Sequence, residues 1–387
     1  MFLSHAGRKD RYARMPLTLT LPRWYDLHAH FRQDALIAPL IAQHLAMGCA
    51  GILAMPNTRP PVSRVQESDS GAGWSIESYQ AMLDAAGGGA FQAIIVPLYL
   101  TRDTTPAMIE SGARAGLLQA CKYYPPHGTT NAEHGQDLHF FAENGVFAAM
   151  EKAGVTLCVH GEAHGLAGAD YFGRASNAEE QFYREDLPRI IDRFPDLRIV
   201  GEHLTTRVAV DLVRAAPAHV MGTITPQHLL YTVGDLLKGL QYHLYCLPLL
   251  KFAEDRAALR AAAADPQNMK FFAGTDSAPH AEKVTSCGCA AGCYTGGIAP
   301  QLYAQAFEEA GVDLGTAQGA RIFQRFLCDI GRDFYQLPAP QGMFTLEKVS
   351  ASVTALSVPG GGTIVPLPLG LAPAGNVVML PWRLRGV

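Results

Sequence analysis

Residues 24–32 read Trp-Tyr-Asp-Leu-His-Ala-His-Phe-Arg, and this stretch decides between two α/β folds. Its apolar beginning predicts a strand over residues 24–30, which ends in His28-Ala29-His30. An open, doubly wound sheet usually carries a glycine-rich phosphate-binding loop after its first strand, and no such loop follows here. A closed barrel of parallel strands instead gathers functional side chains at the carboxyl ends of its strands. The stretch therefore favours the barrel.

The rest of the chain repeats a pattern of short apolar runs, each followed by a segment with helical character. This alternation indicates parallel strands joined by crossover helices. Eight such strands predict an α/β fold of the (β/α)8 TIM-barrel type. The expected strands are 24–30, 51–55, 92–99, 116–123, 155–160, 198–203, 219–223 and 270–275, and the clearest helical windows are 35–48, 75–86, 138–153 and 180–194.

The two ends of the chain differ from this pattern. Residues 1–15 precede the first patterned segment and are expected to be an N-terminal extension, so the barrel is expected to span residues 16–337. Residues 338–387 contain a Pro-Gly-Gly-Gly run at 359–362 and further prolines between β-prone runs at 363–365 and 377–380. Such composition predicts a C-terminal segment packed on the barrel rather than a second domain. Residues 67–73 predict a surface insertion.

The composition is that of a compact enzyme. Apolar residues make up 48% of the 387 positions and charged residues 17%, which excludes a disordered chain. The net charge of −4 gives no electrostatic case for nucleic acid. Apolar runs such as 93–100 fall far short of the roughly 18 residues that a membrane span needs. Eight cysteines in a chain of this length indicate reduced thiols, and we expect a cytoplasmic protein without a membrane partner.

Four histidines occupy positions that suit a metal. His28 and His30 are two residues apart on one strand, so both imidazoles lie on the same face. His160 and His203 each follow an apolar run, at the expected carboxyl end of a strand. Any one of them alone could be an ordinary buried histidine. Four at one rim of a barrel favour a cluster of zinc ligands, because zinc binds neutral imidazole readily.

Two further charged residues end apolar runs. Asp276 could be a helix N-cap, but beside four histidines the interpretation as ligand and general base is favoured. Lys122 could extend its ammonium group to water. Alternatively, a neutral lysine amine can add carbon dioxide and become an anionic carbamate, which could bridge two cations.

Taken in order, the motifs of this chain resemble the dihydroorotases of the bacterial short-chain type, within the amidohydrolase superfamily. The resemblance covers about residues 17–335. Its segments are DLHAHFR at 26–32, MPN at 55–57, CKYYP at 121–125, TTN at 129–131, VHGE at 159–162, EHLTT at 202–206, TITPQHL at 223–229, HLYCLPLLK at 243–251, GTDSAPH at 274–280 and SCGC at 286–289.

The resemblance implies a centre with two Zn²⁺ ions per chain. One ion would be held by His28, His30 and Asp276, and the other by His160 and His203. Lys122, carboxylated by carbon dioxide or bicarbonate to N6-carboxylysine, would bridge them together with a hydroxide.

The implied reaction is the reversible, zinc-dependent cyclisation of N-carbamoyl-L-aspartate to L-dihydroorotate in de novo pyrimidine biosynthesis. In the hydrolytic direction the hydroxide would attack the ring amide carbonyl. Asp276 would take up its proton and deliver it to the departing nitrogen.

The resemblance also implies a substrate site. Arg32, Asn57 and His280 would hold the substrate carboxylate, since the planar guanidinium can donate two parallel hydrogen bonds. Backbone groups at Leu247 and Ala290 would contact the ring, while Thr129 and Thr130 would belong to a mobile loop that closes over it. By the same resemblance the cysteine loop carries one alanine more than the family usually shows, so Ala290 and Ala291 both stay open for this contact. A homodimer is expected from the same resemblance.

Three alternatives accompany this interpretation. The enzyme could hydrolyse another cyclic amide, such as a hydantoin or a dihydropyrimidine, but Arg32 and His280 would then have no carboxylate to bind. A non-catalytic scaffold homologue is disfavoured because all six metal positions are occupied. Cys287, Cys289 and Cys293 could form a structural zinc knuckle, although the spacing lacks an evident fourth ligand.

Overall fold

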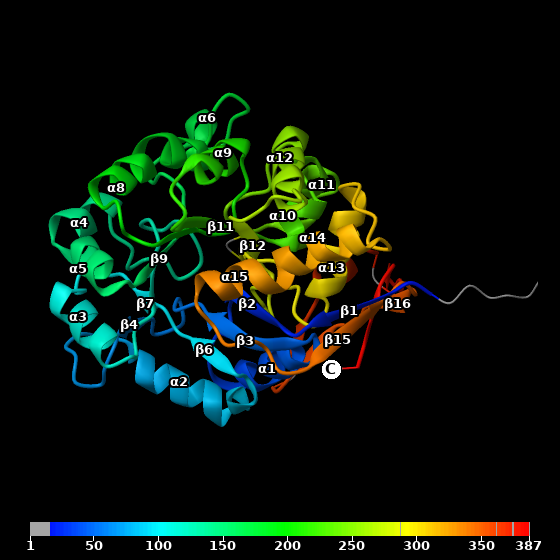
Figure 1. Cartoon of the computed structure of the whole chain (residues 1–387), viewed down its shortest axis with the longest axis horizontal. Helices are drawn as coiled ribbons and strands as arrows, with labels where there is room; N and C mark the ends of the chain where they lie inside the picture. The colour runs from blue at the N-terminus through cyan, green and yellow to red at the C-terminus, as the bar shows by residue number, and fades with distance from the viewer. Residues whose placement is uncertain (1–15, 287, 361, 374, 387) are drawn as a thin grey trace, which may run out of the picture.

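The computed structural model describes residues 16–286, 288–360, 362–373 and 375–386. The expected N-terminal extension, residues 1–15, and Cys287 of the proposed knuckle lie outside the described residues. Figure 1 shows parallel strands in the middle of the molecule with helices on the outside. The α/β class predicted from the sequence is confirmed by this arrangement.

The parallel strands form two sheets within the described residues. One has the strand order β12-β11-β10-β9-β8-β7 and the other has the order β2-β3-β6. β6 and β7 both fall in the expected strand 92–99 and are separated at Val96-Pro97, because proline has no N–H to donate to the ladder. The bounds are β2 (Trp24–Ala29), β3 (Cys49–Ala54), β6 (Ala93–Ile95), β7 (Leu98–Tyr99), β8 (Ala120–Tyr123), β9 (Thr156–Val159), β10 (Ile199–Gly201), β11 (Val220–Ile224) and β12 (Phe271–Ala273).

The two sheets approach each other where β2 ends. Ala29 forms an isolated parallel bridge with Ser277, just after β12. The amide of His30 donates to the Ser277 carbonyl at 3.0 Å, and the amide of Asp276 donates to the His28 carbonyl at 2.8 Å. These bonds place His28, His30 and Asp276 side by side although the chain separates them by about 250 residues.

Helices cover the outer faces of the strands. The expected helix at 138–153 is divided by Gly145, whose φ of 85° is a backbone conformation that suits glycine. The window 180–194 contains a π-helical turn before its final helix. The principal helices are α1 (Ile37–Ala46), α2 (Ile76–Ala85), α3 (Pro106–Arg114), α4 (Leu138–Glu143), α5 (Val146–Ala153), α8 (Leu187–Arg193), α9 (Arg207–Ala215), α12 (Ala253–Ala263), α13 (Ala299–Glu309) and α14 (Ala317–Gln324).

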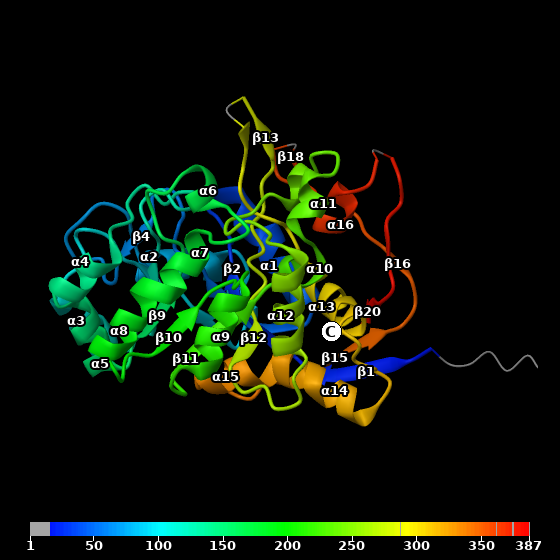
Figure 2. The ribbon, with the colours of Figure 1, turned by 90° about the horizontal axis from the view of Figure 1, so that it is seen from above.

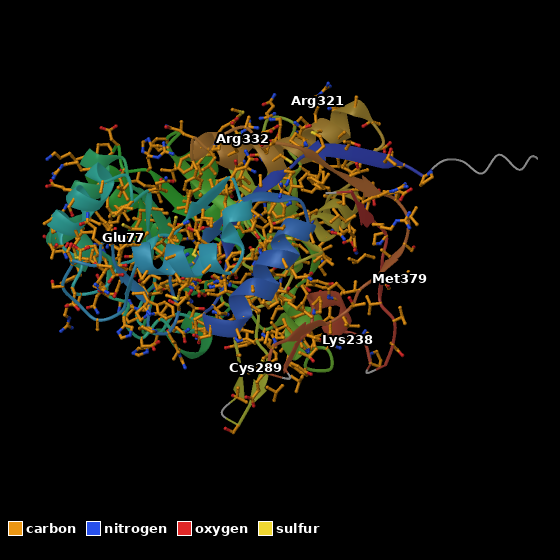
Figure 3. The ribbon with its side chains drawn as sticks, turned by 90° about the horizontal axis from the view of Figure 1, so that it is seen from below. Glu77, Lys238, Cys289, Arg321, Arg332 and Met379 are labelled. Atoms are coloured by element: carbon orange, nitrogen blue, oxygen red, sulfur yellow. The ribbon has the colours of Figure 1, made fainter. Side chains whose placement is uncertain are left out.

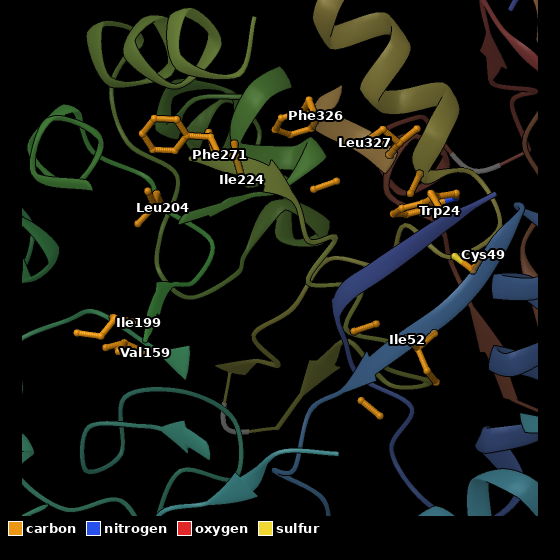
Figure 4. Packing of buried hydrophobic residues seen from close by; sticks show 14 of the residues in the cluster. Trp24, Cys49, Ile52, Val159, Ile199, Leu204, Ile224, Phe271, Phe326 and Leu327 are labelled. Atoms are coloured by element: carbon orange, nitrogen blue, oxygen red, sulfur yellow. The ribbon is translucent and has the colours of Figure 1, made fainter. Parts of the chain in front are cut away.

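The core has two parts because alternate residues of each strand face opposite sides. Toward the helices, Trp24, Ile52, Phe271 and Phe326 belong to one large buried cluster (Figure 4). On the opposite side a separate buried cluster collects one set of strand residues: Tyr25, Leu27, Ala50, Leu53, Met55, Ile95, Ala120, Cys158, Val200, Met221 and Phe272, closed by Ile330. Burial on both faces explains why these strands are apolar throughout.

The C-terminal residues form short antiparallel ladders. β15 (Met343–Glu347) pairs with both β1 (Thr18–Pro22) and β20 (Arg383–Arg385). The β-prone runs predicted at 363–365 and 377–380 contain β18 (Gly362–Ile364), which pairs with β17 (Leu356–Val358), and β19 (Met379–Leu380), which pairs with β16 (Ala351–Ser352). The indole of Trp382 donates to Glu308 of α13 at 3.0 Å. Figure 2 shows β1, β15 and β20 beside α13 and α14.

Two loops stand at the surface. Residues 67–73 lie between β4 (Val62–Arg64) and β5 (Trp74–Ser75) and are mostly exposed, as predicted for an insertion. A hairpin of β13 (Val284–Thr285) and β14 (Gly288–Cys289) projects at one end of the molecule, while Arg332 lies at the other end (Figure 3). Across the described residues, no helix has the length and apolar character of a membrane span.

Candidate metal centre and active site

The side chains predicted as metal ligands come together where the parallel strands end. His28 is the second-last residue of β2, His30 directly follows this strand, and Lys122 lies within β8. The remaining ligands come directly or shortly after the ends of β9, β10 and β12. All of these side chains are buried: His28, His30, Lys122, His160, His203 and Asp276.

Their distances suit a shared cation. Asp276 Oδ1 lies 3.0 Å from Nε2 of His30 and 3.4 Å from Nε2 of His28. Potential ligand atoms of these three residues all lie within 4.8 Å of one another. The ring centres of His28 and His203 are 5.0 Å apart, and those of His160 and His203 are 4.8 Å apart. The imidazoles from three different strands therefore surround one small volume.

Lys122 is the most unusual of these residues. Its side chain is fully buried, so the alternative in which it reaches water does not hold. Its Nζ finds no hydrogen-bond partner among the described residues, and it lies 5.1 Å from the centre of the Tyr124 ring. Burial lowers the pKa of Lys122, against the opposing effect of the Glu202 carboxylate. A buried, unpaired ammonium is costly, and a neutral amine is the form that adds carbon dioxide.

Burial and hydrogen bonding leave His30, His203 and Asp276 in protonation states that can bind a cation. Burial lowers the pKa of His30 to about 4 and that of His203 well below its ordinary value, so both rings are neutral near pH 7. Burial alone would raise the pKa of Asp276, but hydrogen bonds to His28 and His30 hold it well below its usual range. The carboxylate is therefore ionised while its histidine neighbours can offer a lone pair.

Glu202 is a functional residue that the sequence reasoning missed. It is buried, and its Oε2 accepts hydrogen bonds from Nδ1 of His28 and from the hydroxyl of Thr223, both at 2.7 Å. Burial lowers the pKa of His28 most strongly, but the charge of Glu202 and the hydrogen bonds to Asp276 and Glu202 together outweigh it, so the pKa lies above its ordinary value. A proton held on Nδ1 leaves Nε2 of His28 free to face a metal. The signal in the sequence was a carboxylate between a buried strand and His203.

Two more buried carboxylates form hydrogen bonds to the backbone next to the proposed ligands. Asp26 accepts from the amide and hydroxyl of Thr275, at 3.0 and 2.6 Å, and so ties β2 to the residue before Asp276. Glu179 accepts from the amides of Thr205 and Thr206 at 2.8 and 3.1 Å. These amides follow His203, whose φ of 43° is uncommon for a residue with a side chain. Both carboxylates therefore hold the backbone beside a ligand.

A small pocket opens over the imidazoles. Several residues expected to bind substrate line this pocket. His280 does not line it but contacts Arg32, which does: Nη2 of Arg32 lies 3.2 Å from Nε2 of His280. Ala290 does not line this pocket: the neighbouring Ala291 does, and Ala290 faces an adjoining outer groove. The lining residues are His28, His30, Arg32, Asn57, Tyr124, Thr129, Thr130, His160, His203, Leu247, Asp276, Ala278, Ala291 and Gly292.

The Thr129-Thr130 segment lies across the pocket. Asn57 Nδ2 donates to the Thr130 carbonyl at 2.8 Å, and the Thr130 hydroxyl donates to the Ala291 carbonyl at 3.2 Å. Asn131 Nδ2 donates to the Asn57 carbonyl at 2.9 Å. The loop thus separates the inner pocket from the outer groove.

The described cysteines of the loop, Cys289 and Cys293, add no ligands to this centre. Cys293 is buried and Cys289 partly exposed, and both are free thiols. Within the described part of the chain, the group of histidine, cysteine and acidic residues close enough to hold a metal is the one at His28. The knuckle includes Cys287, which lies outside the described residues, so it stays an untested alternative.

The fold and the site together define a class of enzyme. Parallel α/β strands that carry histidines, an aspartate and a buried lysine at their carboxyl ends are characteristic of the metal-dependent amidohydrolases. A scan against family models gives no match. Comparison with curated proteins, however, gives a clear result.

The dihydroorotase of Halorhodospira halophila is 40% identical over 376 residues, which cover 95% of this chain and 99% of that protein. The dihydroorotase of Stutzerimonas stutzeri is 39% identical over 378 residues, covering 96% and 99%. The chain belongs to the dihydroorotase family.

Solved structures agree with this assignment. The dihydroorotase of Saccharomyces cerevisiae, crystallised in complex with 5-fluoroorotic acid, superposes with a TM-score of 0.81 at 26% identity and covers 95% of this chain and 98% of its own. The dihydroorotase of Campylobacter jejuni has a TM-score of 0.79 at 24% identity and covers 97% and 100%. An L-hydantoinase from Arthrobacter aurescens shares the fold at 15% identity, with a TM-score of 0.64.

Proposed function

We propose that this protein is a zinc-dependent dihydroorotase, which interconverts N-carbamoyl-L-aspartate and L-dihydroorotate in pyrimidine biosynthesis. The observation that carries the proposal is the meeting of four buried imidazoles, Asp276 and the unpaired amine of Lys122 beside a pocket that contains Arg32. The names and the close sequence similarity of the curated relatives support it.

The residues present fit a pair of zinc ions. His28, His30 and Asp276 would hold one ion, and His160 and His203 the other, with Lys122 as N6-carboxylysine between them. The unpaired Nζ of Lys122 and the unpaired Nδ1 of His203 are polar atoms that otherwise lack a function in the buried site. When bound, two zinc ions lower the pKa of water and polarise a carbonyl.

Asp276 is the group placed to move the proton. It is ionised and lies within hydrogen-bonding distance of His30, at the floor of the pocket. In hydrolysis it accepts a proton from the attacking water. It returns this proton to the ring nitrogen as the carbon–nitrogen bond of the ring amide breaks, which gives carbamoyl aspartate. Ring closure follows the same steps in reverse.

Arg32 favours a substrate that carries a carboxylate. The residue is buried, and no carboxylate lies within 4.0 Å of its guanidinium in any ion pair of the described residues. A buried guanidinium without an anion is costly, so an anionic ligand is the natural partner. Uncharged hydantoins and dihydropyrimidines would leave it unpaired, which disfavours that alternative.

The Arg32→Met variant tests this assignment. We expect KM for dihydroorotate to rise by about 30-fold or more, because a charge-assisted contact worth about 2–5 kcal/mol is lost. Zinc content should not change, since Arg32 is not a proposed ligand. Steady-state kinetics with metal analysis measures both quantities. Arg59→Met, an exposed arginine at the rim of the outer groove, is the matched control. An unaltered KM in Arg32→Met would remove the carboxylate assignment.

The function itself is tested by assaying the purified protein, supplied with zinc and bicarbonate, against three substrates in parallel. Dihydroorotate should be hydrolysed, while hydantoin and dihydrouracil should be much poorer substrates. Preference for an uncharged ring would favour the alternative cyclic-amide hydrolase, and inactivity toward all three would favour the non-catalytic scaffold.

We further propose that the two parallel sheets close into one (β/α)8 barrel. The bridge between Ala29 and Ser277 joins one pair of sheet edges, and β6 and β7 belong to one interrupted strand. The interior cluster that collects residues from β2 through β12 supports this closure. On this proposal residues 16–337 form the catalytic barrel and residues 338–387 an appended segment.

The remaining expectations are also proposals. We propose a homodimer, which sedimentation would test. Free thiols throughout the described residues support a cytoplasmic location, because cytoplasmic thiols are kept reduced.

A further inference from the structure

Tyr124 is a residue of the pocket to which neither the motifs nor the proposed mechanism gives a task. It follows Lys122 by two residues, at the end of β8, so both side chains point to the same side of the strand. It lines the pocket, and only 1% of its surface is exposed. Its ring centre lies 6.2 Å from that of His160.

The hydroxyl of Tyr124 is buried and has no hydrogen-bond partner among the described residues. Buried polar groups in folded proteins are nearly always paired, and an unpaired one lowers stability. A phenylalanine would fill almost the same space without that cost. The hydroxyl therefore needs a hydrogen-bond partner, and a molecule bound in the pocket can supply one.

The chemistry of the substrate supplies such a partner. Dihydroorotate and carbamoyl aspartate present carboxylate and carbonyl oxygens, which are hydrogen-bond acceptors, and a phenol O–H is a donor. The other pocket side chains near Tyr124, such as His160, are assigned to the metal centre. Tyr124 is thus a neutral donor beside the proposed metal ligands.

We propose that Tyr124 is a substrate-binding residue whose O–H donates a hydrogen bond to an oxygen of the bound substrate. This inference rests on the proposed dihydroorotase function.

The chain offers a matched control in Tyr99. Its ring packs edge-on against Tyr124 at 5.0 Å, it is fully buried, and its hydroxyl also lacks a partner within the described part of the chain. Tyr99 does not line the inner pocket. Each substitution thus removes a hydroxyl from a buried environment, but of the two tyrosines only Tyr124 lines the pocket.

The experiment compares Tyr124→Phe and Tyr99→Phe in the zinc-loaded enzyme. We expect Tyr124→Phe to lower kcat/KM for dihydroorotate by about tenfold to a hundredfold, the effect of one hydrogen bond to a charged or strongly polarised oxygen. Its zinc content should match the wild type, and its unfolding temperature should not fall. Tyr99→Phe should keep kcat/KM within about twofold.

A second measurement reports ligand binding through thermal stability instead of through the reaction rate. Carbamoyl aspartate should raise the unfolding temperature of the wild type and of Tyr99→Phe more than that of Tyr124→Phe. Wild-type kcat/KM in Tyr124→Phe, or a loss that comes with lost zinc, would overturn the inference. A wild-type enzyme that neither turns over dihydroorotate nor responds to carbamoyl aspartate would instead overturn the proposed function.

Discussion

Asp276→Asn will reduce kcat in both directions by about 10³-fold or more, the largest effect that the site predicts. Asparagine keeps the shape of the side chain but cannot take up a proton, so the general acid and base is lost, which alone is worth about 10²–10⁴-fold. The neutral amide is also a weaker zinc ligand than a carboxylate. Steady-state kinetics in both directions measures the loss.

Zinc analysis of the same variant separates these two causes. Excess zinc should restore the metal content of Asp276→Asn without restoring its activity, because the missing proton acceptor cannot be supplied by the metal. Asp137→Asn is a suitable control, since Asp137 caps α4 at a distance from the pocket. A fully metal-loaded Asp276→Asn enzyme with kcat within tenfold of the wild type would show that another group moves the proton.

Lys122→Ala will lose most of its zinc at the bridged centre together with its activity. A bridging anion holds both ions, and the electrostatic stabilisation that depends on them is worth several kcal/mol, so we expect activity to fall by roughly 10³-fold. Added acetate or propionate should restore part of the activity, because a free carboxylate can occupy the space that the lysine leaves. Metal analysis and kinetics with and without these acids measure both effects.

The surface variant Lys152→Ala is the control for this substitution, since its side chain is 78% exposed. It should keep its zinc and should not respond to acetate. The proposal of a carboxylated lysine would fail if Lys122→Ala retained both zinc ions and its turnover.

The sequence predicted the strands and the ligands for the same physical reason. A parallel strand buried on both faces is an apolar run, and the polar residues that follow it lie at the carboxyl edge of the sheet. His160, His203 and Asp276 could be placed in this way, and the spacing of His28 and His30 put both on one strand face. Their meeting at one point follows from the fold.

Other features depend on contacts that no local pattern reports. Glu202 looks like a polar residue at a strand end until the structure brings it to Nδ1 of His28. Glu179 supports the loop after His203 from a helix that precedes it by more than 20 residues. The pairing of β1 with β15 joins two segments that lie far apart in the sequence, and it could not be inferred from either segment alone.

Local details also limited the prediction. The break between α4 and α5 depends on Gly145 in the left-handed conformation, within a window whose apolar pattern continues on both sides. The sequence left open whether Ala290 or Ala291 lies at the substrate site, and the structure places Ala291 in the pocket wall.

The most direct test of the whole account is a crystal structure of the zinc-loaded protein with dihydroorotate, measured at the zinc absorption edge. We predict two anomalous peaks among the four histidines, with extra density that extends Nζ of Lys122 between them and the substrate carboxylate at Arg32. A single peak, with an unmodified Lys122 directed away from it, would contradict the account.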